Sequence, residues 1–350
     1  MHRPLPRGVF LAVSRSLTLG VLALAPLLPS AVHAAAPQVR TQAPGFYRMM
    51  LGDFEVTALS DGTVPLTVRE VATHTTPERV TELLSRDHLE DPVELSINAF
   101  LVNTGTALVL VDTGVGGFFG PDVGGRLQQS LQAAGYQPEQ IDVVLLTHIH
   151  SDHSGGLMSA TRRAFPNAIL QVHAREAAFW LGHNPRPKGT VDPKYFEEAR
   201  AMVEPYQVAG KLKTFGDGDT VVPGIRAVPT PGHTPGHSAY VVESRGQRLA
   251  LWGDLMHFGS VQLREPSVTV AYDVDERAAA AQRARAFTEA AKRGDLLGFA
   301  HMPFPGLGRL GTEGRPGAEG RPGAEGKSYR WIPINYSSGQ RWQPAKVRAD

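Results

Sequence analysis

The 350-residue chain contains no cysteine. This absence excludes a disulfide framework, a thiolate metal ligand and a cysteine nucleophile, so any catalysis has to use histidine and carboxylate side chains. Basic runs are also missing, and the 35 Lys and Arg residues nearly balance the 34 Asp and Glu residues. Because no concentrated positive charge is present, we expect no nucleic-acid partner.

Long apolar runs are confined to the N-terminus. Three arginines precede an apolar stretch at residues 17–28, and small residues at 31–34 offer a cleavage site. The stretch is short and contains proline, which is atypical of a membrane-spanning helix. We therefore interpret residues 1–34 as a signal peptide and expect an exported protein, periplasmic or secreted, with no stable membrane span after cleavage. An uncleaved anchor is the alternative.

The remaining chain predicts one globular domain. The hydrophobic content of the full 350-residue chain, 42%, is enough for a large core. We expect a linker over residues 35–45, a single domain over 46–340 and a C-terminal tail over 341–350. The hexapeptide Arg-Pro-Gly-Ala-Glu-Gly occurs twice in succession at residues 315–326. Such a Gly- and Pro-rich repeat cannot form a packed core, so it predicts a solvated loop insertion without a function of its own.

Several elements are predicted from local signals. The alternation at residues 54–62 predicts a strand that enters a turn at Asp61-Gly62. Helices are predicted over 174–181, from Asp192 towards Pro205, and over 275–293 with an end at Gly294. Residues 329–336 predict a terminal strand, and Pro333 places it at a sheet edge.

The densest chemical signal follows a short apolar run at Val143–Leu146, which predicts a buried strand. His148, His150, Asp152 and His153 come directly after it. Two imidazoles two residues apart can converge on one ion, while the aspartate and the third histidine point towards a neighbouring position. The pattern therefore favours two adjacent divalent metals. The alternative is a polar loop in which histidines cluster by chance.

The segment His-Ile-His-Ser-Asp-His resembles the HxHxDH signature of the metallo-β-lactamase-fold hydrolases. The resemblance implies an α/β fold, an αββα sandwich of two mixed β-sheets flanked by helices. It also implies three further ligands, and His233, Asp254 and His301 each follow a strand-like run. The implied metal ligands are His148, His150, Asp152, His153, His233, Asp254 and His301.

The resemblance also distributes these ligands between two ions. One ion would be held by His148, His150 and His233, and the other by Asp152, His153 and His301, with Asp254 as the bridge. Asp112, which ends a predicted hairpin over residues 98–114, would accept an imidazole N–H beneath the metal loop. Its alternative is an Asx turn without a metal role. His237 is predicted to support a ligand from behind. His and carboxylate donors without thiolate favour Zn²⁺, with Mn²⁺, Co²⁺ or Fe²⁺ as alternatives.

A substrate pocket is predicted from aromatic residues and one histidine. An aromatic-tipped glycine loop follows the hairpin, and many relatives of this kind use the region corresponding to residues 180–196 as a lid over the metals. The predicted pocket residues are Phe118, Phe119, Trp180, Tyr195, Phe196 and His257. For the aromatic residues, packing in the core is the alternative.

The predicted leader, the Phe118-Phe119 loop and the segments at residues 301–306 and 329–333 most resemble the methyl parathion hydrolase and quorum-quenching lactonase branch of this family. We expect a metal-bridging hydroxide to attack neutral hydrophobic esters, foremost organophosphate triesters or aryl esters. A lactonase for acyl-homoserine lactones is the alternative, followed by a β-lactamase, a thioesterase or a non-catalytic metal-binding protein. Asp152 would pass a proton to the leaving group and Asp254 would bridge the metals. The resemblance also implies a small-molecule ester, phosphotriester or lactone substrate and a homodimer.

Overall fold

The computed structural model describes residues 36–182, 191–313 and 328–337 of the chain. Residues 36–42 form no helix or strand, and the folded unit begins at Ala43. The predicted signal peptide, repeat and C-terminal tail lie outside the described residues, so they stay predictions. Among the helices of the described residues, none combines the length and the apolar character needed to cross a membrane.

The first of two large sheets contains seven strands and is mixed. Its strands run in the order β1-β2-β4-β5-β6-β9-β10. The pairs from β1 to β5 are antiparallel, whereas β5, β6, β9 and β10 are parallel. The bounds are β1 Phe46–Leu51, β2 Phe54–Leu66, β4 Val93–Asn103, β5 Leu108–Val111, β6 Val143–Leu145, β9 Ile169–His173 and β10 Leu212–Phe215.

The second large sheet also contains seven strands, in the order β11-β12-β13-β14-β16-β17-β18. Only β14 and β16 pair in parallel. The bounds are β11 Thr220–Val222, β12 Ile225–Pro229, β13 Ser238–Ser244, β14 Gln247–Leu251, β16 Leu296–Gly298, β17 Leu307–Glu313 and β18 Ser328–Pro333. Two short ribbons pair β3 Ala72–Thr73 with β15 Thr269–Val270, and β7 Met158–Ser159 with β8 Arg162–Arg163.

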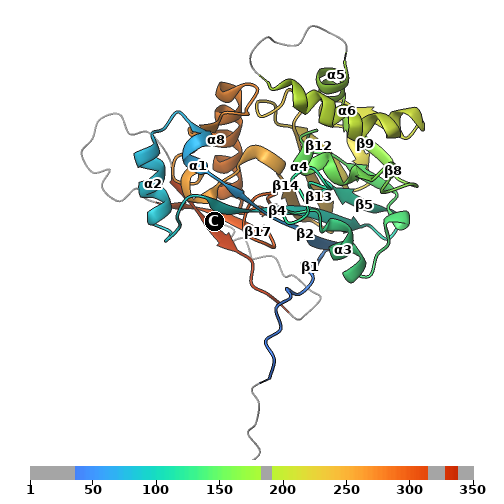
Figure 1. Cartoon of the computed structure of the whole chain (residues 1–350), viewed down its shortest axis with the longest axis horizontal. Coiled ribbons are helices and arrows are strands. Elements are labelled where there is room, and N and C mark those ends of the chain that lie inside the picture. Colours follow the sequence, from blue (N-terminus) through green and yellow to red (C-terminus); the bar gives the residue numbers. More distant parts are fainter. Residues whose placement is uncertain (1–35, 183–190, 314–327, 338–350) are drawn as a thin grey trace, which may run out of the picture. The chain divides into compact units, whose positions relative to one another are not determined.

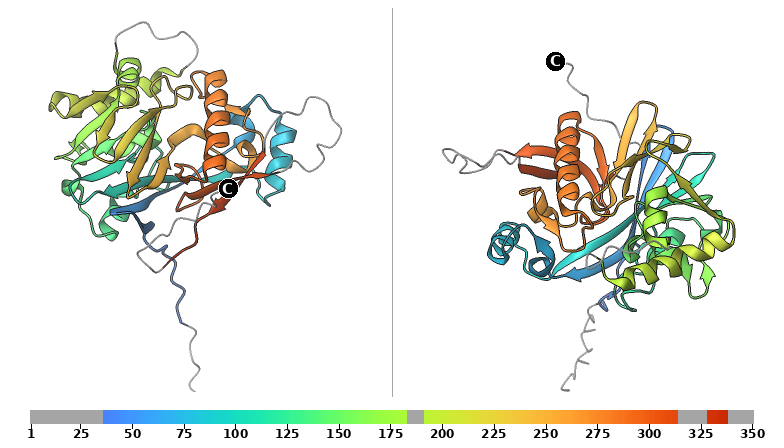
Figure 2. Two further views of the ribbon diagram at one scale, coloured as in Figure 1. Left: turned by 180° about the vertical axis from the view of Figure 1, so that it is seen from behind. Right: turned by 90° about the horizontal axis from the view of Figure 1, so that it is seen from above.

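Helices cover the outer faces of both sheets (Figures 1 and 2). The α-helices are α1 Val68–Val71, α2 Pro77–Ser85, α3 Leu127–Ala133, α4 Ser151–Ser154, α5 Ala174–Leu181, α6 Pro193–Val208, α7 Gly259–Gln262 and α8 Glu276–Arg293. Apolar residues of α3, α5 and α6 share a buried cluster with the first sheet. Residues of α8 share another with the second sheet. A third cluster joins the inner faces of the two sheets, which completes the predicted αββα sandwich.

The uninterrupted apolar run of β5 follows from this layering. Leu108 and Leu110 belong to the cluster beneath the helices, whereas Val109 and Val111 belong to the cluster between the sheets. Side chains alternate between the two faces of a strand, and here both faces are buried. The strand therefore needs apolar residues at every position.

The helix ends predicted from local signals are confirmed where a side chain defines them. Helix α5 spans Ala174–Leu181 as expected. Asp192 caps α6 by accepting from the Lys194 N–H. Asp275 caps α8, and Gly294 ends it in the left-handed conformation with φ +64°. A side chain that bonds the first turn, or a glycine that adopts positive φ, sets a helix end locally.

Two predicted boundaries are wrong. Strand β2 does not turn at Asp61 but continues through an irregularity between Ser60 and Gly62 to Leu66. The Asp61 side chain accepts hydrogen bonds from backbone N–H groups of a distant loop instead of closing a turn. Helix α6 continues past Pro205 to Val208. The terminal strand β18 does lie at the sheet edge, as Pro333 predicts.

Candidate metal centre

All seven predicted ligands converge at one edge of the two sheets. His148 follows β6 by three residues, Asp254 follows β14 by three, and His301 follows β16 by three. His233 comes four residues after β12 ends, and α4 carries Asp152. The neighbouring strands of these parallel pairs end at the same edge, so residues far apart in the sequence meet there.

Three histidines form the first group. His148 Nε2 lies 3.1 Å from His150 Nδ1, and His233 Nε2 lies 3.2 Å and 3.0 Å from these two atoms. His148 and His233 are fully buried, at 0% and 2% exposure. Imidazoles about 2.0–2.1 Å from a tetrahedral ion have nitrogens about 3.4 Å apart, close to this spacing.

The outer nitrogens of two of these rings are occupied. His233 Nδ1 lies 2.7 Å from Asp273 Oδ1, a carboxylate that accepts its proton. His148 Nδ1 lies 3.1 Å from Thr147 Oγ1, and that hydroxyl donates to Asp112. The protons of His148 and His233 are therefore on their outer nitrogens, and their inner nitrogens present lone pairs to the centre. Two convergent lone pairs are the arrangement that a bound cation needs.

The second group contains Asp152, His153, Asp254 and His301. Asp254 Oδ1 lies 3.1 Å from His153 Nε2 and 3.0 Å from His301 Nε2. Asp152 Oδ2 lies 3.4 Å and 3.5 Å from the same two nitrogens. The His301 ring donates through Nδ1 to the Ser96 carbonyl at 3.0 Å, so its Nε2 also faces the centre with a lone pair.

Asp254 joins the two groups. Its Oδ1 faces the second group, while its Oδ2 lies 3.4 Å from His233 Nε2 and 3.7 Å from His148 Nε2. The preceding Gly253 has φ +52°, and a Cβ there would meet Thr147 Cβ at 2.8 Å. Glycine therefore permits the close backbone approach that presents Asp254 between the groups.

Unsatisfied polar atoms show that the donor set fits two divalent ions. Within the described residues, His153 Nε2 and Asp254 Oδ1 are buried, and although they lie 3.1 Å apart they do not form a well-aligned hydrogen bond. Leaving buried polar atoms unpaired costs about 1–3 kcal/mol each. Cations coordinated by these atoms would remove that cost, and His with carboxylate donors is a set that divalent transition metals accept.

Protonation states in the centre suit metal binding. Burial lowers the pKa of His150 and of His237 to about 3, so both imidazoles are neutral at pH 7. Burial by itself raises the pKa of Asp254, but the imidazoles of His153 and His301 outweigh it and hold that pKa well below the usual range. The pKa of His153 and of His301 is raised instead, because the carboxylates of Asp254 and Asp152 outweigh burial. The centre therefore combines neutral imidazoles in the first group with ionised carboxylates in the second, whose negative charge favours a cation.

Asp112 and His237 lie behind the ligands. Asp112 Oδ2 accepts from His153 Nδ1 at 2.9 Å, and its Oδ1 accepts from the Thr147 N–H at 2.8 Å. His237 Nε2 accepts from the Asp254 N–H at 3.0 Å, and its Nδ1 lies 2.7 Å from Thr230 Oγ1. Both contacts are of the kind predicted from the sequence, and the roles themselves stay predictions.

Two of the predicted pocket residues lie in the core. Trp180 is 0% exposed and Phe196 is 2% exposed, and both belong to the cluster beneath the first sheet. This burial favours the packing alternative, and a place for these two residues in a pocket stays a prediction. Their packing follows because their helices bury an apolar face against the sheet.

The other predicted pocket residues have mixed surroundings. The Tyr195 ring lies 5.7 Å from the His150 ring, and the His257 ring stacks 5.7 Å from the His301 ring. Phe119 is 40% exposed. Phe118 is half-buried beside the loop that follows His153, where a Cβ on Gly155 would lie 3.1 Å from its ring.

Three residues near the centre escaped sequence reasoning. Asp273 and Glu176 are buried carboxylates behind the ligands, and the Tyr272 ring lies 5.2 Å from His257 and 5.9 Å from His233. No short motif contains them. The detectable signal is a glutamate four residues before a tryptophan on the apolar face of a helix, as in Glu176 and Trp180.

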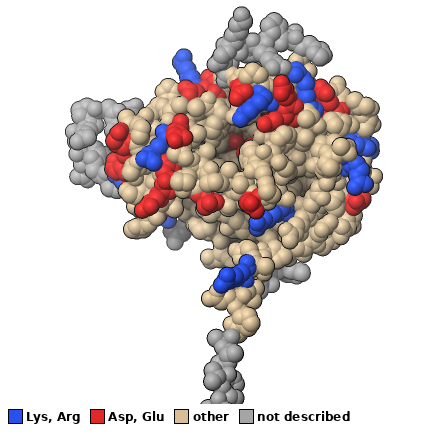
Figure 3. Space-filling model, viewed as in Figure 1, with Lys and Arg blue, Asp and Glu red and all other residues tan. Residues whose placement is uncertain are grey.

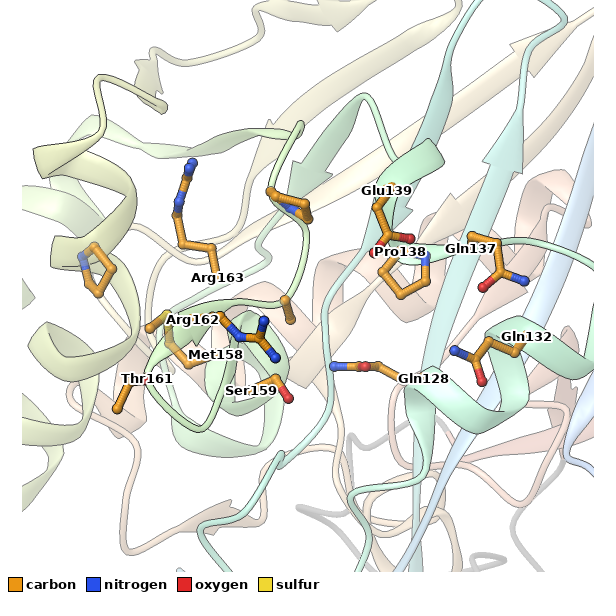
Figure 4. Close-up of a pocket in the computed structure, with 13 residues that line it drawn as sticks. Gln128, Gln132, Gln137, Pro138, Glu139, Met158, Ser159, Thr161, Arg162 and Arg163 are labelled. Carbon is orange, nitrogen blue, oxygen red and sulfur yellow. The ribbon is translucent and has the colours of Figure 1, made fainter.

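A polar cavity elsewhere is unrelated to this centre. It has a volume of about 630 Å³, with Gln128 and Gln132 on one side and Arg162 and Arg163 on the other (Figure 4). None of the seven candidate ligands lines it.

The molecular surface points to an entrance to the centre that is separate from this cavity. Figure 3 shows a hollow with acidic side-chain atoms at its floor and with basic and acidic side chains interspersed around it. Within the centre itself, the Asp152 side chain is 22% exposed, whereas that of Asp254 is 2% exposed. Two carboxylates face both candidate ligand histidines of the second group, and of these two only Asp152 is partly open to solvent.

Solved structures with similar folds include hydrolases. The hydrolase AbOPH of the beta lactamase superfamily is 35% identical, with a TM-score of 0.76, and the match covers 85% of this chain and 100% of that chain. AidC, a dizinc quorum-quenching lactonase solved with the product N-hexanoyl-L-homoserine, is 26% identical. Its TM-score is 0.72, and the match covers 84% of this chain and 99% of AidC.

Sequence comparison gives shorter matches. An N-acyl homoserine lactonase from a Bacillus species is 30% identical over 173 residues, which are 43% of this chain and 60% of that protein. The chain thus spans less than two thirds of the length of this curated relative. The family model of the metallo-beta-lactamase superfamily matches residues 92–301, which include all seven candidate ligands. With its αββα sandwich and this ligand arrangement, the chain belongs to the metallo-beta-lactamase superfamily.

Proposed function

We propose that this protein is a metal-dependent hydrolase that opens neutral lactones, foremost N-acyl homoserine lactones. The observation that carries the proposal is the pairing of two ligand groups around one shared carboxylate, Asp254. Two adjacent divalent ions are a recurrent catalytic device of hydrolases. The similarity to AidC and to the Bacillus lactonase supports lactones as the substrate class.

The proposed centre has one ligand set for each ion. The ligands are His148, His150 and His233 for one ion and Asp152, His153 and His301 for the other, with Asp254 shared. When bound, two divalent ions supply Lewis acidity towards the substrate carbonyl oxygen and towards water. Imidazole and carboxylate donors are a set that zinc accepts, and the similarity to the dizinc lactonase AidC supports zinc.

Asp152 is the residue that can move a proton. Its Oδ2 faces His153 and His301, whereas its Oδ1 makes no hydrogen bond to the described residues. Burial by itself raises its pKa, but the two imidazoles outweigh burial and lower it, so the carboxylate is ionised at pH 7. It can therefore accept a proton from the attacking water and return it to the leaving alkoxide.

Two tyrosines can orient the substrate. The Tyr195 ring lies beside His150, and the Tyr272 ring lies beside His257. Burial raises the pKa of both phenols, which keeps both protonated at neutral pH. Protonated phenols can donate hydrogen bonds to the carbonyl or ring oxygen of a lactone.

Organophosphate triesters and aryl esters are the second candidate substrates. Phe304 comes three residues after the candidate ligand His301, and Phe119 lies on the loop after Asp112; their side chains are 37% and 40% exposed. Exposed aromatic rings near the centre would favour aryl groups. The same Lewis acidity acts on a phosphoryl oxygen as on a carbonyl oxygen.

The deciding experiment is a turnover panel on the zinc-loaded protein. It compares kcat/KM for N-hexanoyl homoserine lactone with kcat/KM for methyl parathion, each with and without a chelator. We expect the lactone value to exceed the phosphotriester value at least about tenfold, with both abolished by chelation. A larger value for methyl parathion would reverse the order of the two candidates, and chelator-resistant turnover would refute metal-dependent hydrolysis.

A further inference from the structure

Glu176 is a carboxylate buried to 0% exposure on α5. Its Oε1 accepts from the Ile149 N–H at 3.0 Å and from Trp180 Nε1 at 2.6 Å. Its Oε2 accepts from Thr234 Oγ1 at 2.7 Å and from the Gly236 N–H at 2.9 Å. Four partners thus occupy both oxygens, and they lower the pKa of the carboxyl, although burial outweighs them and leaves that pKa above its usual value.

These donors belong to the segments that carry the three-histidine group. Ile149 lies between His148 and His150, and Thr234 directly follows His233. One side chain therefore ties the loop after β6 to the loop after β12 without contacting any of the three imidazoles. The two loops are more than 80 residues apart in sequence and have no covalent reason to keep a fixed separation.

His150 depends on this arrangement more than its two neighbours do. His148 and His233 each have a side-chain partner at their outer nitrogen. Within the described part of the chain, the outer Nε2 of His150 has none. Its ring instead contacts the Trp180 indole, with centroids 5.3 Å apart, and the indole N–H is held by Glu176.

The charge of Glu176 also lacks a partner in the protein. No basic side chain of the described residues lies within 4.0 Å of it, and all its donors are neutral. A buried carboxylate without a counter-charge is costly. A divalent ion held by three neutral imidazoles would supply positive charge to the same region.

We propose that Glu176 is the positioning residue of the three-histidine site, which fixes the two ligand loops relative to each other and strengthens that site's affinity for a divalent ion. This inference rests on the metal centre proposed above. Residues that orient metal ligands from behind typically change metal affinity by about 10- to 100-fold.

The test is the zinc affinity and zinc content of the variant Glu176→Gln, measured by chelator competition and elemental analysis. Glutamine carries an amide nitrogen in place of one carboxylate oxygen. The two donors that bonded to that oxygen would then face another donor and would lose their acceptor. We expect one of the two ions to bind about 10- to 100-fold more weakly, while the other keeps its native affinity. Cobalt substitution adds a spectroscopic signature, because the loss should affect the absorption of one site only.

Asp61→Asn is the matched control. Asp61 is also buried, at 1% exposure, and accepts from three backbone N–H groups, but it makes no contact with either ligand loop. We expect this control to lower the melting temperature while both ions bind as in the native protein. Equal weakening of the binding of both ions in Glu176→Gln would mean that Glu176 has a general structural role. Unchanged binding of both ions would mean that it has no such role. Either result would show that the inference is wrong.

A second variant keeps the inference testable if Glu176→Gln fails to fold. Trp180→Phe keeps an aromatic ring at this position and removes the N–H donor to Glu176, together with part of the buried ring volume. We expect a selective weakening of one ion by about 3- to 10-fold, since one of four donors is lost. Native affinity for both ions in this variant would overturn the inference. These readouts need no substrate, so they are independent of whether lactones prove to be hydrolysed.

Discussion

Asp112→Asn is the sharpest single perturbation of the second ligand group. Asp112 Oδ2 accepts from both His153 Nδ1 and Thr147 Oγ1, each at 2.9 Å, and Oδ1 accepts from the Thr147 N–H. Asparagine offers one acceptor oxygen, so its amide nitrogen must face at least one donor. The backbone tolerates the change, because Asp112 has φ +61° and asparagine readily adopts that conformation.

The expected magnitude follows from the lost hydrogen bond. A bond to a charged acceptor contributes about 1.5–3 kcal/mol, which corresponds to about 10- to 150-fold in affinity. The imidazole of His153 can relieve the conflict by moving its proton to Nε2, but that nitrogen then cannot bind a metal. Either route weakens the ion held by His153.

The assay is zinc affinity by chelator competition, with the melting temperature of the metal-free protein measured in parallel. Asp217→Asn is the control, because Asp217 accepts from His173 Nε2 at 2.8 Å at a surface site remote from the ligands. We expect weakened binding of one ion in Asp112→Asn and native binding in Asp217→Asn. Affinities within about threefold of native for both ions in Asp112→Asn would refute the assigned contact.

Three further perturbations have defined outcomes. Asp254→Ala removes the shared carboxylate, so elemental analysis should find fewer than two ions per chain, and two tightly bound ions with normal turnover would exclude a bridge. Arg283→Met removes the donor to the carbonyls of Leu255 and Pro266, whereas the Val268 carbonyl keeps Gln262 Nε2, so urea unfolding should show a loss of about 2 kcal/mol or more in the free energy of unfolding, and a loss below about 1 kcal/mol would contradict this. Burial raises the pKa of the Tyr206 phenol from 10.0 to about 12. The unfolded chain therefore loses this proton at a lower pH than the folded protein does. The free energy of unfolding should fall by up to about 2.7 kcal/mol as the pH rises from 10 to 12. Unfolding of Tyr206→Phe should lack this alkaline component, and an unchanged alkaline loss would assign it to other groups.

Sequence reasoning succeeded where a local pattern defines the structure. Strand β6, the histidine cluster and helix α4 lie within fifteen residues, so short-range spacing already contains two of the three histidines of the first group and two of the four residues of the second. Helix α8 was predictable because Asp275 and Gly294 define its ends by their own hydrogen bonding and backbone conformation.

It failed where burial or a distant partner decides. Glu176 has hydrogen-bond partners 27, 58 and 60 residues away, and nothing near it in the sequence announces them. Asp61-Gly62 has the composition of a turn, yet pairing with β4 on one side and the buried loop on the other keeps β2 extended. For Trp180 and Phe196, packing and a pocket stayed alternatives because aromatic residues serve both packing and recognition, and only burial separates the two.

The most direct measurement is a zinc titration of metal-stripped protein, followed simultaneously by bound metal and by hydrolysis of N-hexanoyl homoserine lactone. We expect activity to be absent without metal and to reach its maximum only when two ions per chain are bound. Full activity with one ion, or hydrolysis that does not depend on metal, would contradict a hydrolase that works through two ligand groups joined by Asp254.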